Sequence, residues 1–215
     1  MLLFFALATL SVAYAQPGTD EQLAAQYFQQ GDYAKAILYY EKIHRKQPNT
    51  YYYEQLLKSY VALNDLDGAE KLVKDQLRRS NNEARYYIDL GGVYKANGEA
   101  DKANKEYDKA LKQMGSDQNN IRTVANAFQQ ANELDRAIEA YERGGRTLPA
   151  GQSFAYEIAG LYGAKGNTAK MVSAYMDLLA VNEGYIQAVQ NALSRSIDFT
   201  LADERSEVLR TELLR

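Results

Sequence analysis

The chain has 215 residues, of which 46% are hydrophobic and 25% are charged, and its formal net charge is −3 at pH 7. This balance is that of an ordinary globular protein, and a near-neutral charge without a basic stripe argues against a nucleic-acid partner. The absence of cysteine excludes disulfides, thiolate metal sites and thiol catalysis.

The first 15 residues have the pattern of a secretory signal peptide. Leu2 to Val12 is almost wholly apolar, and the small-x-small sequence Ala13-Tyr14-Ala15 follows it. The apolar run is shorter than the roughly 20 residues that a membrane-spanning helix needs. We therefore predict an exported protein, periplasmic or secreted, that is cleaved after Ala15 and has no stable membrane span after cleavage. An uncleaved anchor is the alternative, because no Lys or Arg precedes the apolar run.

A regular period follows this segment. The recurring positions, at intervals of 33, 34, 34 and 34 residues, are Ala36, Ala69, Ala103, Ala137 and Met171. A fixed period in this range is typical of a solenoid, in which one helix-turn-helix unit is copied and stacked. A small residue at this position lets the two helices of a unit approach closely where they cross. Met171 therefore predicts a slightly wider helix crossing in the fifth unit.

The third unit shows the repeated pattern most completely. Its motif consists of Tyr87-x-x-Leu90-Gly91-x-x-Tyr94, then Gly98-Glu99, then Ala103-x-x-x-Tyr107-x-x-Ala110. Large residues at i, i+3 and i+7 lie on one helix face, and Gly-Glu supplies the turn between two helices. This unit closely resembles the tetratricopeptide repeat, with Tyr87 where that family most often has Trp.

The same pattern recurs in register over about Pro17 to Tyr185. The resemblance implies an all-α, right-handed superhelical solenoid of five tetratricopeptide helix-turn-helix repeats of about 34 residues each, with a C-terminal helix pair. The predicted domains are a signal peptide at 1–15, the repeat array at 16–185 and a helical segment at 186–215. This last segment, with apolar stripes such as Ile186, Val189, Leu193 and Ile197, either caps the array or begins further repeats.

Several local features carry expectations of their own. Thr19-x-x-Gln22 and Ser80-x-x-Glu83 have the spacing of a helix capping box. Gly144 and Gly145 lie near the end of a predicted helix, where each costs roughly 1 kcal/mol relative to alanine. We therefore expect that helix to fray early.

Nothing in the sequence indicates catalysis, a cofactor or a metal. His44, the only histidine, lies among Lys42, Arg45 and Lys46, so we predict that it faces solvent. Asp65-x-Asp67-Gly68 lacks the remaining ligands of a calcium loop and is interpreted as the turn inside a repeat. The chain is therefore predicted not to be an enzyme.

The resemblance implies that the concave surface, built from the first helix of each unit, holds a partner. Matching repeat positions place the following residues on this groove: Tyr51, Lys58, Arg85, Lys95, Arg122, Asn126 and Tyr156. Arg122 and Asn126 are one helical turn apart and share a face. They resemble part of the carboxylate clamp with which some family members hold a peptide C-terminus, but the rest of that clamp is absent. Glu157 stands where that clamp has an amide, which argues against a binder of chaperone tails.

Tyrosine, arginine and amides are residues that protein-binding surfaces favour. The predicted function is a non-catalytic protein–protein interaction scaffold in the cell envelope, whose partner is a protein or peptide. The alternative is a structural spacer or oligomerisation arm of a longer envelope protein, so that self-association stays open. A third reading is an enzyme or glycan-binding protein that uses the superhelix as a frame.

Overall fold

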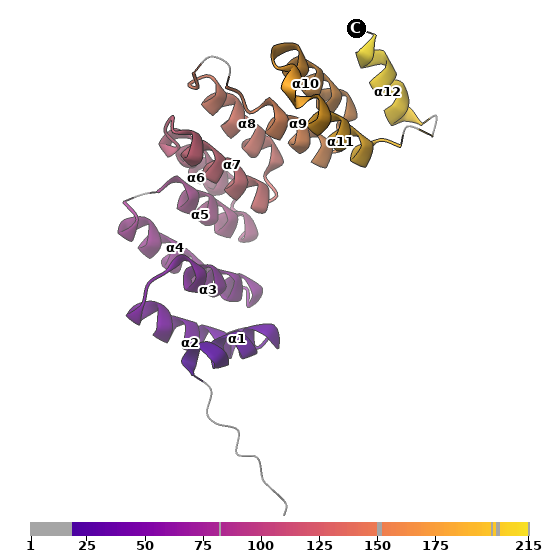
Figure 1. Ribbon diagram of the computed structural model, residues 1–215. Coiled ribbons are helices and arrows are strands. Elements are labelled where there is room, and N and C mark those ends of the chain that lie inside the picture. Colours follow the sequence, from indigo (N-terminus) through magenta and orange to yellow (C-terminus); the bar gives the residue numbers. More distant parts are fainter. Residues whose placement is uncertain (1–18, 82, 150–151, 199, 201–202, 215) are drawn as a thin grey trace, which may run out of the picture. The chain divides into compact units, whose positions relative to one another are not determined.

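The computed structural model describes residues 19–81, 83–149, 152–198, 200 and 203–214 (Figure 1). The predicted signal peptide and its cleavage site lie outside the described residues. The chain divides into two compact units, Met1–Leu72 and Val73–Arg215. The boundary between the units lies within one helix, Leu66–Arg79.

Most of the described residues lie in helices, which are labelled in Figure 1. The helices are α1 (Asp20–Gln29), α2 (Tyr33–Lys46), α3 (Thr50–Ala62), α4 (Leu66–Arg79), α5 (Ala84–Ala96), α6 (Ala100–Gln113), α7 (Gln118–Gln130), α8 (Leu134–Gly145), α9 (Ala155–Ala164), α10 (Thr168–Val181), α11 (Ile186–Ser196) and α12 (Glu204–Leu213). A single 3-10 turn, Glu183–Tyr185, precedes α11. Packing is strongest between α1 and α2, α5 and α6, α7 and α8, and α9 and α10. The predicted all-α fold of helix-turn-helix pairs is therefore confirmed.

The turn inside each pair contains one residue with a left-handed backbone. These residues are Gly31, Asn64, Gly98, Asn132 and Gly166, with φ between 57° and 74°. Glycine and asparagine are the residues that adopt this conformation at least cost. In the third pair, the amide of Glu99 donates to the carbonyl of Tyr94 at 2.8 Å and that of Gly98 to Lys95 at 3.0 Å. These are the hydrogen bonds of a Schellman motif, which ends one helix and allows the next to begin.

The helix-crossing positions are buried in every pair. Ala36, Ala69 and Ala137 have no exposed surface, Ala103 is 2% exposed and Met171 is 3% exposed. These positions therefore have the burial that the predicted repeat register requires. A Cβ atom at Gly163 of α9 would lie 2.8 Å from the sulfur of Met171. The missing side chain at Gly163 thus supplies the space into which Met171 extends.

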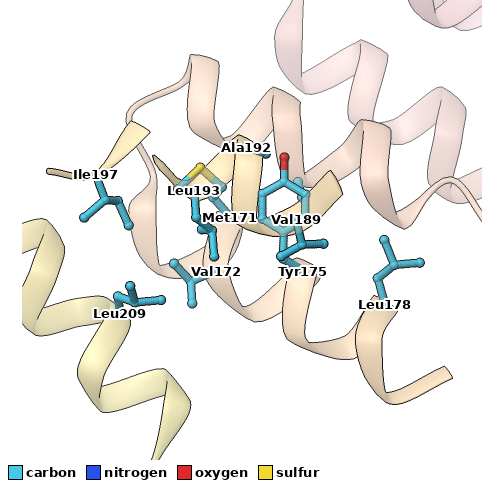
Figure 2. Close-up of a cluster of buried hydrophobic side chains, with 10 residues drawn as sticks. Met171, Val172, Tyr175, Leu178, Val189, Ala192, Leu193, Ile197 and Leu209 are labelled. Carbon is cyan, nitrogen blue, oxygen red and sulfur yellow. The ribbon is translucent and has the colours of Figure 1, made fainter. Parts of the chain in front are cut away.

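Each unit has its own apolar core. In the first unit the core contains Ala24, Ala36, Ile37, Tyr40, Ile43 and Leu56. Figure 2 shows a core of the second unit, in which side chains of α10, α11 and α12 converge. The predicted stripe of α11 is buried at Val189, Leu193 and Ile197, whereas Ile186 is 54% exposed. Leu209 attaches α12 to this core, and α12 packs on α10.

Two of the local expectations concern helix starts. Thr19 forms the predicted capping box, because its hydroxyl accepts from the amide of Gln22 at 3.3 Å while the Gln22 side chain accepts from the amide of Thr19 at 3.0 Å. The box predicted at Ser80 and Glu83 is wrong. The Ser80 amide still donates to the carbonyl of Gln76 at 2.9 Å, so Ser80 continues the end of α4, and Glu83 is itself the residue that precedes α5.

The prediction that His44 faces solvent is also wrong. His44 is only 8% exposed. It follows Ile37 by seven residues and Tyr40 by four, so it lies on the same face of α2 as these two buried side chains. That face packs on α3. The flanking basic residues point elsewhere on the helix and gave no indication of this burial.

The glycine pair at the end of α8 has a packing role. Gly144 is buried, and a Cβ atom there would lie 2.6 Å from Cγ2 of Ile121, a side chain with no exposed surface. The nearest atom to a Cβ at Gly145 is 3.9 Å away, on Phe154. Only Gly144 is therefore required by the close approach of α7 to α8.

Candidate functional site

The predicted groove residues all lie on the first helices of the pairs. We call the surface formed by these first helices within one unit the first-helix face. The structure places Tyr51 and Lys58 on α3 in the first unit, and Arg85, Lys95, Arg122, Asn126 and Tyr156 on α5, α7 and α9 in the second. Within the second unit, α5 contacts α7, and a side-chain ion pair links α7 to α9.

That ion pair joins Arg122 to Glu157. The guanidinium of Arg122 pairs through Nη1 with Oε1 of Glu157, and it lies 5.1 Å from the centroid of the Phe154 ring. The Arg122 side chain is 42% exposed and that of Glu157 is 23% exposed. A carboxylate of the chain itself therefore neutralises this cation, at the position where the clamp would have an amide.

Two more side chains extend the contact from α7 to α8. The Tyr141 hydroxyl donates to Oδ1 of Asn126 at 3.3 Å, and the Tyr141 ring lies 4.9 Å from that of Phe154. Burial raises the pKa of Tyr141, the nearby Glu157 raises it further, and Arg122 partly opposes both effects. We call this connected group the Arg122 cluster; its members are Arg122, Asn126, Tyr141, Phe154 and Glu157.

Lys95 does not belong to the Arg122 cluster. Its ammonium pairs with Oε1 of Glu133 at 2.6 Å, and the Tyr107 hydroxyl donates to the same oxygen at 3.3 Å. Glu133 precedes α8 without capping it through its side chain. Lys95 and Tyr107 therefore use this carboxylate to link the third helix pair to the fourth.

Arg85 borders a separate cavity of about 270 Å³. Its guanidinium lies 5.3 Å from the ring centroid of Tyr86. The cavity lies between the start of α5, the end of α6 and α7, with Gln113, Met114 and Asn120 among its lining residues. Arg122 is not among the lining residues, so the structure does not join the two predicted arginines in one site.

Tyr156 lies at the edge of a core. Its ring centroid is 5.6 Å from that of Tyr175 and 6.3 Å from that of Tyr185, and it packs against the cluster drawn in Figure 2. Much of its ring is therefore committed to packing inside the unit. Only the exposed part of the Tyr156 side chain contributes to the first-helix face.

In the first unit, Tyr51 is 54% exposed and Lys58 lies two turns further along α3. The rings of Tyr51 and Tyr52 meet at 68° with centroids 5.5 Å apart, and the Tyr52 hydroxyl donates to Glu21 of α1 at 2.9 Å. Sequence reasoning missed Tyr52, as it missed Tyr141 and Phe154. Position within the repeat gave no signal for their roles, because the contacts of Tyr52 with Glu21 and of Tyr141 with Phe154 are made across helix pairs.

Two observations limit the kinds of site present in the described residues. No group of three or more His, Asp or Glu side chains there is arranged to hold a metal ion. None of the helices there combines the length and the apolar character that crossing a membrane requires. The segment Asp65 to Gly68 was predicted to be a turn, but it is the start of α4, whose Gly68 amide donates to the Asp65 carboxylate at 2.9 Å as in a helix N-cap.

Comparison with known proteins identifies one of the helix pairs. Residues 84–113, which span α5 and α6, match the family model described as the tetratricopeptide repeat. No curated protein matches the sequence. The third helix pair is therefore similar to a tetratricopeptide repeat. The other pairs share its turn and its buried crossing position.

Several solved structures are similar to this chain. The MamA protein is 20% identical, with a TM-score of 0.38, over 78% of this chain and 92% of that chain. A thermophilic TPR protein of Thermus thermophilus is 15% identical, with a TM-score of 0.41, over 82% and 96% of the respective chains. The C-terminal part of a TPR repeat-containing protein from Cytophaga hutchinsonii is 19% identical, with a TM-score of 0.39, over 90% and 79%.

Proposed function

We propose that this protein is a non-catalytic interaction scaffold that binds a segment of a partner polypeptide on its first-helix faces. Tetratricopeptide repeats are generally protein-interaction modules, and repeat arrays use such extended surfaces for binding. The observation that carries the proposal is the Arg122 cluster. It presents Arg122 and the exposed amide of Asn126 over the buried rings of Tyr141 and Phe154, and arginine is among the residues that dominate the energetics of protein interfaces.

The contacts of Arg122 suit it for binding. Glu157 and the Phe154 ring hold the guanidinium in place, so less side-chain entropy is lost when a partner docks. A guanidinium carries five N–H donors, and one carboxylate does not use them all. We propose that the remaining donors bind backbone carbonyl groups of the partner, with the exposed part of Asn126 beside them.

Substitution of the two arginines tests this proposal. Arg85→Ala and Arg122→Ala should each weaken binding of the partner by about 1–3 kcal/mol, the range for loss of a charge-assisted contact. The partner would first be isolated by affinity capture from the native cells with the mature protein. Binding curves of the purified pair would then be compared with the thermal midpoints of each variant.

The control variant is Lys105→Ala, which changes an exposed residue on α6, a second helix. Lys109, which also lies on α6, is unsuitable as a control because its ammonium pairs with the largely buried Glu106 at 2.7 Å. Since Arg122→Ala also uncovers Phe154, Arg122→Lys provides a variant that keeps the charge. Unchanged binding by all groove variants, with binding lost in Lys105→Ala, would place the working surface on the second helices.

We further propose that the protein is exported and acts in the cell envelope, in the periplasm or beyond. The apolar run from Leu2 to Val12 and the site Ala13-Tyr14-Ala15 support this. Intact-mass measurement of the protein from its native host should give a chain that begins at Gln16. A membrane-bound chain that retains Met1 would instead show a signal anchor.

A spacer or oligomerisation arm is the second candidate function. Exposed apolar side chains near the end of α12 favour it, since Leu213 is 60% exposed and Leu214 is 83% exposed. Contiguous exposed apolar surface commonly marks a contact site. Sedimentation of the mature protein separates the two functions: concentration-dependent self-association that Leu213→Ser abolishes supports the arm, and a monomer at high concentration supports the scaffold.

A further inference from the structure

The first unit contains a group of tyrosines beside a carboxylate. Tyr51 and Tyr52 are on α3, and their ring planes meet at 68° with centroids 5.5 Å apart. The Tyr52 hydroxyl donates to Oε1 of Glu21 on α1 at 2.9 Å. Tyr51 is 54% exposed, and Glu21 is exposed as well. The rings of Tyr51 and Tyr52 thus form an angled pair that faces solvent, which we call the corner. The negative charge of the Glu21 carboxylate lies at its edge.

Buried contacts hold this corner in place. Tyr40 of α2 is 1% exposed, its ring centroid lies 6.2 Å from that of Tyr52, and its hydroxyl is hydrogen-bonded to Tyr51. Burial and this hydrogen bond raise the pKa of Tyr40 well above its usual range. Both rings of the corner are therefore anchored from behind, and a ligand would not have to order them.

Aromatic faces and a carboxylate attract the same kind of group. The face of a tyrosine ring carries negative charge density, and a cation close to it is attracted electrostatically. The carboxylate of Glu21 adds a full charge. The neighbouring Asp20 is already paired with Lys42 at 2.8 Å. The opposite charges of this pair largely cancel, so the pair adds little to the electrostatic potential at the two rings. Lys58 is seven residues from Tyr51, or about 10 Å along α3, where salt screens its repulsion.

We infer that Tyr51, Tyr52 and Glu21 form a binding site for a basic side chain, lysine or arginine, of a partner polypeptide. The inference rests on the proposed function in that it assumes a polypeptide ligand, and it adds the chemistry by which one side chain of that ligand is recognised. The Arg122 cluster differs, because there the chain itself supplies the cation. The two first-helix faces therefore bind different groups of a partner, backbone carbonyls at the Arg122 cluster and a basic side chain at Tyr51, Tyr52 and Glu21.

Defined peptides test this inference without knowledge of the native partner. The full chain, labelled with 15N, would be titrated with acetylated, amidated Gly-Gly-Lys-Gly-Gly and with the same peptide carrying arginine, norleucine or glutamate at the centre. We expect the lysine and arginine peptides to shift the amide signals of Tyr51 and Tyr52 and to bind about fivefold tighter than the norleucine peptide. Equal binding of lysine and norleucine would overturn the inference in favour of simple apolar packing.

Three variants and a control sharpen the result. Tyr51→Leu removes the ring but keeps an apolar side chain, and should weaken lysine-peptide binding about fivefold. Tyr51→Phe keeps the ring and should bind almost as the parent does. Glu21→Gln keeps an oxygen for the Tyr52 hydroxyl but removes the charge, so binding should weaken and lose most of its salt dependence. Tyr185→Leu, at a 40% exposed tyrosine of the second unit, should change nothing.

Failure of this inference and failure of the proposed function give different results. If Tyr51→Leu binds the lysine peptide as the parent does, the inference is wrong, whatever the native partner does. If the lysine peptide binds as expected but no polypeptide can be captured from cells, the cation site stands and the scaffold function fails.

Discussion

Replacement of Ala103 by leucine should lower the free energy of unfolding by about 1–3 kcal/mol through overpacking. Ala103 is 2% exposed and lies on α6, the helix that packs on α5. Leucine would add three carbon atoms where the two helices cross, and protein interiors are too densely packed to absorb that volume without moving a backbone.

The matched control is Ala100→Leu. Ala100 is exposed at the first position of α6, so a larger side chain there meets solvent and should change stability by about 0.5 kcal/mol or less. Urea denaturation of both variants would measure the difference. Similar midpoints for the two would show that the repeat register is wrong, since the crossing position would then have no special packing.

The two adjacent glycines of α8 should respond to alanine with opposite signs. Alanine is favoured over glycine inside a helix by roughly 1 kcal/mol. At Gly144 this gain meets a clash, because the new Cβ atom would lie 2.6 Å from Cγ2 of the fully buried Ile121. Ile121 is β-branched and stiff, so Gly144→Ala should be destabilising by about 1–2 kcal/mol overall.

Gly145→Ala should instead be stabilising by about 0.5–1 kcal/mol. The nearest atom to its new Cβ would be 3.9 Å away, an ordinary contact with Phe154. Thermal or urea unfolding of the two single variants measures both signs in one experiment. Stabilisation by both substitutions would mean that α7 can move away from α8 at little cost. Destabilisation by both would mean that the end of α8 does not keep helical geometry.

Much of the architecture follows from local sequence. The turns at Gly31, Asn64, Gly98, Asn132 and Gly166 repeat at the same spacing as the crossing positions. Each depends on a residue that tolerates positive φ, and each crossing position depends on a small or flexible side chain. These requirements act within one helix pair, so a 34-residue period in the sequence is enough to reveal them.

The candidate site depended on contacts that the period does not contain. Arg122 was identified by its repeat position, but its partners Glu157 and Phe154 come from the next helix pair. Tyr52 was overlooked because its hydrogen-bond acceptor, Glu21, lies on the first helix of the preceding pair. Repeat position predicts which face a side chain occupies, and the particular residues of two neighbouring pairs decide what it contacts there.

The sequence by itself therefore determined the repeat helices, their turns and the pairing of the two helices within each repeat, because these arise from interactions within about 34 residues. The packing of α12 on α10 did not follow from it. Only the tertiary structure decided how residues that depart from the repeat pattern are accommodated by their neighbours. Gly163 makes room for Met171, Gly144 admits Ile121, and His44 is buried despite its basic neighbours. For both glycines the deciding neighbour lies on a different helix, and the packing of side chains between helices is not encoded in the composition of either helix alone.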